Sequence, residues 1–223
     1  MSLLPAVSVE HDPAPAIRLR RFGLAPPRVI VVGASTGGPR ALARLLRDLA
    51  PSLDVPVAVV LHMPVGFVAT ICVGITRETG LAARVMGHGD RLRAGQVHFA
   101  AGPLHCRIAS VGADLVSQHH DAAPVHFCKP AVDILFRSAA DACGAETLGI
   151  VLTGMGTDGL AGASAIVASG GSIIAQDEAT SVVWGMPGAV ARAGLCAAVA
   201  PIEEIGARVA VRLARRERLA RSC

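Results

Sequence analysis

A serine between glycines, a histidine and an aspartate each follow a stretch typical of a buried parallel β-strand. Ser35 is the central residue of a G-x-S-x-G string, His62 directly follows the apolar run at residues 57–61, and Asp158 lies just beyond the run at residues 149–152. A histidine can take the proton of a serine hydroxyl, and a carboxylate can orient the histidine ring. Because parallel strands end at one edge of a sheet, we expect the three side chains to meet there.

A phosphate-binding turn is the main alternative for the glycine-rich string. A dinucleotide-binding fingerprint needs a glycine at the position of Ser35 and an acidic residue where the second strand ends, but the chain continues there as Leu61-His-Met-Pro64. A P-loop needs Gly-Lys followed by Ser or Thr, and the sequence has no such string. Both nucleotide-binding motifs are incomplete, so the pattern favours a serine nucleophile.

Each of the three residues also has a purely structural interpretation. Ser35 can be the N-cap of the following helix, a position that serine often fills. His62 can be a structural histidine at a strand end. Asp158 can cap the helix expected to begin near residue 160, and for this residue alone that interpretation is the stronger one. The case for chemistry therefore depends on all three falling at one edge of the sheet.

The apolar pattern from residue 28 onwards alternates between strands and helices. Strands are expected at residues 29–32, 57–61, 149–152, 172–175 and 196–199. Helices are expected at residues 40–49, 65–79, 132–143, 160–169, 187–192 and 201–219. Three short runs at 97–101, 106–109 and 115–117 are typical of a hairpin or small antiparallel extension. The fold class is therefore α/β, a doubly wound, mostly parallel sheet with helices on both faces, three-layered and Rossmann-like.

Composition and charge fit one cytoplasmic α/β domain. Hydrophobic residues make up 52% of the 223 residues and aromatic ones 3%, so the core is expected to be aliphatic. We expect a flexible leader at 1–27, a catalytic domain at 28–216 and a basic tail at 217–223. The net charge is only +4 and there is no basic stripe with stacking aromatics, which argues against nucleic-acid binding. The sequence shows no apolar run long enough for membrane insertion and no signal peptide.

Metal and cofactor binding are not expected from the sequence. The six cysteines include no C-x-x-C pair and are interpreted as reduced thiols. The nearest approaches to a metal-binding cluster are His119-His-Asp121 and His126-x-Cys128, which lack the paired spacing of a structural zinc site. We interpret them as solvent-exposed loop residues, with adventitious metal affinity as the alternative.

The chain resembles the catalytic domain of the chemotaxis protein-glutamate methylesterases, the CheB family. The matching strings occur in the family's order and cover nearly all of residues 28–205. They are Gly33-Ala-Ser-Thr-Gly-Gly38, His62-Met-Pro64 with Gly66-Phe67, Pro130-Ala-Val-Asp-Ile-Leu-Phe136, Leu152-Thr-Gly-Met-Gly-Thr-Asp-Gly159, Ala175-Gln-Asp-Glu-Ala-Thr-Ser181 and Gly185-Met-Pro187.

The resemblance implies a role for each residue of the site. Ser35 would be the nucleophile, His62 the base and Asp158 the residue that orients the base. Thr36 would shape the site beside the nucleophile, and the backbone N–H of Met155 would stabilise the oxyanion. The implied substrate is a glutamate methyl ester on the cytoplasmic domain of a chemoreceptor, with methanol as a product. Many members also deamidate receptor glutamines, and no cofactor is implied.

This chain departs from the family's pattern in two segments and in the expected lack of one domain. Members usually carry an N-terminal receiver domain of roughly 120 residues, for which the expected leader is too short, so regulation by a separate protein is one possibility. Cys128-Lys129 replaces a His-Arg pair, and the Lys lacks the planar donor fork of Arg. The helix that follows Phe67 lacks the family's charges at Ile71-Cys-Val-Gly-Ile75.

These departures leave two alternatives to receptor methylesterase activity. The first is a chemosensory binding or regulatory module with weak activity. The second is an esterase or deamidase that uses the same three residues on a different protein.

Overall fold

Seven parallel strands form the central sheet, in the order β3-β4-β2-β1-β7-β8-β9. The computed structural model describes residues 16–220. The strands are β1 Val29–Ala34, β2 Val57–Leu61, β3 Ala82–Val85, β4 Gln96–Ala100, β7 Thr147–Val151, β8 Ser172–Gln176 and β9 Ala198–Ala200. The doubly wound parallel fold expected from the sequence is thus confirmed.

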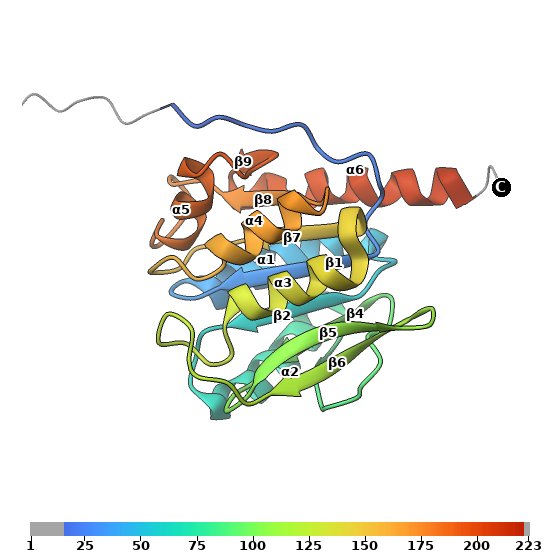
Figure 1. Cartoon of the computed structure of the whole chain (residues 1–223), viewed down its shortest axis with the longest axis vertical. Coiled ribbons are helices and arrows are strands. Elements are labelled where there is room, and N and C mark those ends of the chain that lie inside the picture. Colours follow the sequence, from blue (N-terminus) through green and yellow to red (C-terminus); the bar gives the residue numbers. More distant parts are fainter. Residues whose placement is uncertain (1–15, 221–223) are drawn as a thin grey trace, which may run out of the picture.

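Helices cover both faces of the sheet (Figure 1). The helices are α1 Gly38–Leu49, α2 Val68–Thr79, α3 Val132–Cys143, α4 Leu160–Ala168, α5 Met186–Arg192 and α6 Ile202–Ala220. Three short 3₁₀ turns are η1 Ala50–Ser52, η2 Val65–Phe67 and η3 Gly144–Glu146. Side chains of successive strand residues point to opposite faces. In β1, Ile30 and Val32 therefore pack with α1, α2 and α6, whereas Val29 and Val31 pack with α3, α4 and α5.

β1 lies at the centre of the sheet, where the chain order changes direction. It pairs with β2 on one side and with β7 on the other. Ligand sites of open α/β sheets lie beyond the carboxyl ends of the strands at such a switch point. Gly33 in β1 lets α3 come close to this edge, because a Cβ at this position would lie 2.4 Å from a methyl carbon of Val132.

An antiparallel hairpin lies outside the main sheet. It consists of β5 His105–Val111 and β6 Asp114–His120, and its buried residues join the core on the α3 side. The sequence prediction for residues 97–101 is wrong: this run does not belong to the hairpin but forms β4, which pairs with β2 in the parallel sheet. β3 was not predicted, because an edge strand with mostly exposed residues has no apolar pattern.

The described part of the expected leader runs against the domain. The Arg20 N–H donates to Cys196 O over 2.8 Å, and the Gly23 N–H donates to Ser172 Oγ over 2.9 Å. Arg212 on α6 donates to the carbonyl oxygens of Gly23 and Ala25. Residues 1–15 and 221–223 of the expected leader and tail lie outside the described residues.

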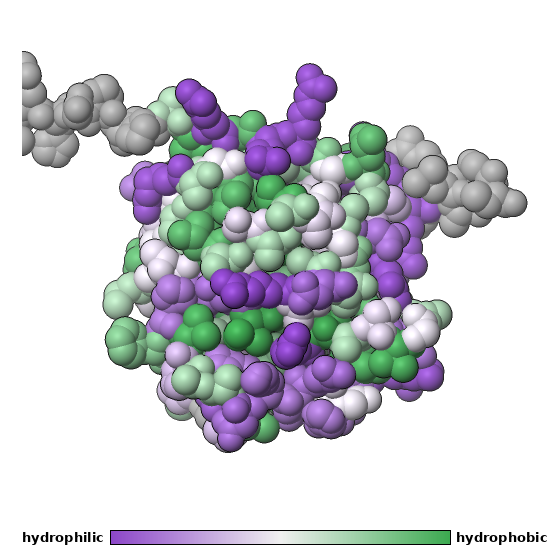
Figure 2. All heavy atoms as spheres, viewed as in Figure 1, coloured by the Kyte–Doolittle hydropathy of each residue, from purple (hydrophilic) through white to green (hydrophobic). Residues whose placement is uncertain are grey.

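The surface changes in character across the face that carries α3. Figure 2 shows mostly apolar and weakly polar residues over α4, and hydrophilic residues mixed with apolar ones over the hairpin. The helix α4 contains no charged residue, in agreement with this view. Among residues 16–220, no helix combines the length and apolar character needed to cross a bilayer.

Candidate active site

The backbone brings the three predicted residues to one edge of the sheet. Ala34, the last residue of β1, is in register with Leu61, the last residue of β2, so Ser35 and His62 leave the sheet side by side. The Ser35 N–H donates to Thr153 O over 3.0 Å, which ties Ser35 to the loop after β7. Asp158 ends that loop.

His62 and Asp158 are in direct contact. His62 Nε2 lies 2.8 Å from Asp158 Oδ2, and the two side chains are 13% and 2% exposed. The carboxylate also accepts two backbone N–H groups at the start of α3, from Val132 to Oδ2 at 2.7 Å and from Asp133 to Oδ1 at 2.9 Å. Asp158 is therefore fixed by α3 and presents one oxygen to the imidazole ring.

The environment of Asp158 favours its charged form. Burial alone would raise the pKa of the carboxyl group, but the hydrogen bonds from His62, Asp133 and Val132 outweigh this effect and hold the pKa below its ordinary value. The group is thus ionised at neutral pH. An ionised acceptor at Nε2 keeps the proton on that nitrogen and leaves Nδ1 of His62 as an acceptor.

Each of two buried aspartates caps the helix that lies beside the other aspartate in the sequence. Asp158 caps α3, while Asp133 Oδ1 accepts the N–H groups of Gly159 at 3.0 Å and Gly162 at 2.7 Å at the start of α4. The structural interpretation of Asp158 as a cap of the helix near residue 160 is therefore wrong, since Asp133 has that role. This reciprocal arrangement stabilises the loop that carries Asp158.

Ser35 is partly exposed and does not cap α1. The N-cap of α1 is Gly37, in the left-handed conformation with φ 79°, and no side chain caps this helix. Close packing fixes the serine, because a Cβ on Gly154 would lie 2.8 Å from Ser35 Cβ. Within residues 16–220, Ser35 Oγ and His62 form no direct hydrogen bond, but catalytic contacts often tighten when substrate binds.

Thr36 and Met155 both lie at the open side of this edge. Thr36 is exposed, and its carbonyl oxygen accepts the hydroxyl of Thr153 over 2.9 Å. Thr153 also accepts the Val183 N–H over 3.0 Å, so it joins the loop after β1 to the loop before α5. The Met155 side chain is 74% exposed, and its N–H has no acceptor among the described residues. That N–H is free to donate to a substrate oxygen.

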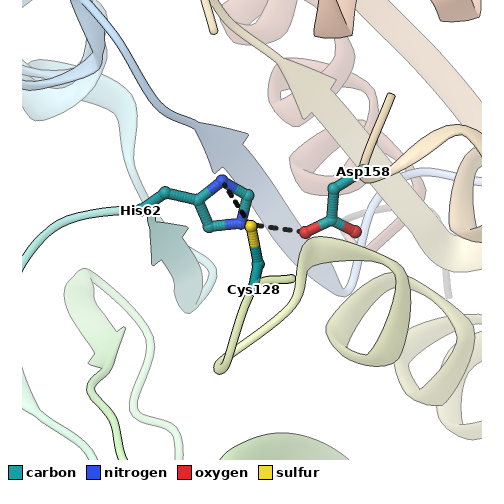
Figure 3. A group of neighbouring side chains, drawn as sticks. All are labelled: His62, Cys128 and Asp158. Carbon is teal, nitrogen blue, oxygen red and sulfur yellow. Dashed lines mark hydrogen bonds and ion pairs between the residues drawn. The ribbon is translucent and has the colours of Figure 1, made fainter. Parts of the chain in front are cut away.

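Cys128 is a part of this site that the sequence did not reveal. Its Sγ lies 3.6 Å from Nδ1 of His62, the ring nitrogen on the side away from Asp158. Figure 3 shows the three side chains pointing toward one another from separate loops. Burial, together with the negative charge of Asp158, raises the pKa of the Cys128 thiol. The loop carrying Cys128 has no regular periodicity. The sequence pointed to Cys128 as part of His126-x-Cys128 and as a departure from the family string, but not as a neighbour of His62.

The two clusters considered for metal binding in the sequence are separated in the structure. The loop interpretation is wrong for His119 and His120, which lie in β6 and pair with β5. His119 Nε2 lies 3.1 Å from Met86 O, and Asp121 pairs with Lys129. His126 Nε2 lies 3.3 Å from Asp133 Oδ2, whereas Cys128 Sγ lies 3.6 Å from His62 Nδ1. Within residues 16–220, the group whose ligand atoms come together is His62, Cys128 and Asp158, all within 4.8 Å of one another.

Comparison with known proteins identifies the family. The fold and this edge are those of an α/β protein carrying the side-chain types that serine hydrolases use. A family model described as CheB methylesterase matches residues 30–209. The crystal structure of the Thermotoga maritima CheB methylesterase catalytic domain matches with a TM-score of 0.81 and 30% identity, over 84% of this chain and 99% of that chain. The chain belongs to the CheB methylesterase family.

Curated relatives agree with this assignment. A protein-glutamate methylesterase/protein-glutamine glutaminase from Nocardioides sp. (strain ATCC BAA-499 / JS614) is 50% identical over 188 residues, which are 84% of this chain and 51% of the relative. One named as of group 2 operon, from Rhodopseudomonas palustris (strain ATCC BAA-98 / CGA009), is 44% identical over 92% of this chain and 56% of the relative. The chain thus spans about half the length of the curated relatives it matches.

Proposed function

We propose that this protein is a serine hydrolase that removes methyl esters from glutamate side chains of chemoreceptors and releases methanol. The observation that carries the proposal is the 2.8 Å contact between His62 and Asp158 beside Ser35, in a chain of the CheB methylesterase family. The proposed catalytic domain is residues 28–216, flanked by the leader at 1–27 and the tail at 217–223. The proposed location is the cytoplasm.

The first half of the reaction forms an acyl-enzyme. Nδ1 of His62 takes the proton of the Ser35 hydroxyl as Oγ attacks the ester carbonyl carbon. The negative charge that develops on the carbonyl oxygen is stabilised by the Met155 N–H, with Thr36 lining the same side. When the carbon–oxygen bond to the methoxy group breaks, His62 returns the proton to the leaving oxygen and methanol departs.

The second half regenerates the serine. A water molecule gives a proton to His62 and attacks the acyl carbon, and the bond to Ser35 Oγ breaks as His62 gives that oxygen the proton. The products are the receptor glutamate and free enzyme. Asp158 stays ionised throughout, holds the proton on Nε2 and stabilises the imidazolium that forms in each half.

Deamidation of receptor glutamines fits the same residues. The amide carbonyl would receive the same attack, and His62 would protonate the departing ammonia rather than methanol. The curated relatives carry both activities in their names. We therefore include glutamine deamidation in the proposal, with the methylated chemoreceptor cytoplasmic domain as the partner and a separate regulator protein as a second partner.

The proposal is tested by methanol release from a methylated receptor cytoplasmic fragment. Wild-type protein and Ser52→Ala are expected to release methanol at equal rates. Ser52 lies in η1, and its hydroxyl donates a hydrogen bond to Leu49 O over 3.3 Å. The Ser35→Ala rate is expected to fall by a factor on the order of 10⁴ or more. A glutamine-bearing fragment assayed in parallel measures ammonia release.

Absence of methanol from folded wild-type protein would contradict the proposal. Tight receptor binding without turnover would then favour a regulatory module. Hydrolysis of methyl esters on another protein would instead support the proposed reaction but show that the substrate is a different protein. Both results would direct attention to the departures at Cys128-Lys129 and at Ile71-Ile75.

A further inference from the structure

We infer that His62 and Cys128 form a binding site for a soft divalent cation of the zinc type, which switches the site off when it binds. Sγ of Cys128 and Nδ1 of His62 are 3.6 Å apart. A tetrahedral zinc ion, with sulfur at about 2.3 Å and nitrogen at about 2.0–2.1 Å, holds these two atoms about 3.5 Å apart. The separation of the two ligand atoms thus already matches that of a zinc site.

Asp158 prepares the imidazole ring for a metal. Histidines that bind metals usually donate their other ring N–H to a carboxylate, which fixes the ring and makes the ligating nitrogen more basic. Here Asp158 Oδ2 is 2.8 Å from Nε2, whereas the ring nitrogen near Cys128 Sγ is Nδ1. Its negative charge also offsets the positive charge left on an ion that is bound by one thiolate and one neutral imidazole.

A cavity gives the ion access and room for water ligands. It has a volume of about 210 Å³ and is lined by His62 and Cys128 together with Met63, Phe127 and Lys129. The ammonium group of Lys129 would repel a cation, but it is paired with the carboxylate of Asp121. Water molecules in this cavity can complete the tetrahedron, so we expect an exchangeable rather than a structural site.

Binding would remove the base that the proposed function requires. The ion takes the Nδ1 lone pair that accepts the Ser35 proton, and the Cys128 S–H proton passes to the buffer as the metal–sulfur bond forms. Loss of activity therefore rests on the proposed esterase function, whereas binding itself does not. Cys128 stands where the family string has histidine, so this thiolate ligand is a property of this chain.

Another pair of histidines lies close together but is already engaged in hydrogen bonds. The rings of His88 and His119 are 6.0 Å apart, edge to face. His88 Nδ1 accepts the His119 N–H over 3.1 Å, and His119 Nε2 lies 3.1 Å from Met86 O. This pair serves as a control for weak binding to surface histidines.

The binding test uses cobalt(II), which replaces zinc and gives a near-ultraviolet charge-transfer band when a thiolate binds it. Titration of wild type should show this band at one cobalt per chain, and Cys128→Ala should abolish it. His88→Gln and Cys223→Ser should retain the band. Ser35→Ala should retain it as well, so the result does not depend on esterase activity. A band that persists in Cys128→Ala, or no band in wild type, would overturn the inference.

The inhibition test compares zinc titrations of activity, each scaled to the variant's own metal-free rate. The inhibition constant should rise by about 100-fold in Cys128→Ala, because loss of a ligand should weaken binding at least as much as loss of an outer partner. A chelator should restore wild-type activity. Equal inhibition constants in the two proteins would overturn the proposed switch, even if cobalt binds.

Discussion

Replacing Asp158 with asparagine separates the two roles of this residue, which binds the base and caps α3. Both carboxylate oxygens of Asp158 are acceptors, Oδ1 for Asp133 N–H and Oδ2 for Val132 N–H and His62 Nε2. Asparagine has one oxygen and one NH₂ group, so either orientation places a donor against a buried N–H of α3. The variant is therefore expected to lose stability as well as activity.

The size of both effects follows from these contacts. Hydrogen bonds to a charged group contribute about 1.5–3 kcal/mol, and an unsatisfied buried donor costs about 1–3 kcal/mol. A loss of about 2–3 kcal/mol lowers the melting temperature of a domain of this size by roughly 4–12 °C. If NH₂ faces His62, the proton moves to Nδ1 and the ring cannot accept the serine proton, a defect on the order of 10⁴-fold in rate.

Asp133→Asn is the matched control. Asp133 Oδ1 alone accepts the two α4 N–H groups, and an asparagine oxygen can replace it. Oδ2 lies 3.3 Å from Nε2 of the exposed His126, and a neutral imidazole nitrogen can accept from the asparagine NH₂ group that would replace Oδ2. Thermal unfolding and methanol release, measured well below both melting temperatures, should show a near-normal Asp133→Asn and a defective Asp158→Asn. Wild-type stability and rate in Asp158→Asn would refute the reasoning. Equal defects in both variants would show instead that any change between α3 and α4 disturbs the site.

Two further predictions concern a glycine of the site and a buried histidine. Gly154→Ala should lower methanol release at least about tenfold, because the added Cβ would lie 2.8 Å from Ser35 Cβ and displace the nucleophile; a wild-type rate would contradict this. Burial lowers the pKa of His98 to about 4. Below pH 6.5 the unfolded chain therefore takes up a proton at His98 that the folded protein excludes. The free energy of unfolding is expected to fall as the pH drops from 6.5 toward 4. Urea unfolding should show that the free energy of unfolding of wild type falls by on the order of 2 kcal/mol between pH 7.5 and pH 5, and that the fall is smaller in His98→Gln. Equal losses in both proteins would be evidence against this role of His98.

The strand ends that carry the site were predictable because their apolar runs are long and uniformly buried. The runs behind Ser35 and His62 form β1 and β2, whose register places the two residues side by side. Asp158 was placed at the correct edge for the same reason. Their catalytic roles stay predictions until activity is measured.

Contacts made by loops and edge strands could not be predicted in the same way. Nothing in the spacing of Asp133 and Asp158 indicates that each caps the other's helix, since this depends on how α3 packs against β1 at Gly33. The approach of Cys128 to His62 depends on an irregular loop 66 residues away. β4 was placed in a hairpin because its short run does not distinguish parallel from antiparallel pairing.

The most direct test of the central claim is to identify the residue that reacts with a fluorophosphonate, a reagent that forms an adduct with activated serines. Mass spectrometry of digested wild-type protein should place one adduct on Ser35. Ser35→Ala should carry none, and Asp158→Asn should react far more slowly. An adduct on another residue, or an unmodified Ser35 in folded protein, would contradict the claim that His62 and Asp158 activate Ser35 as the nucleophile.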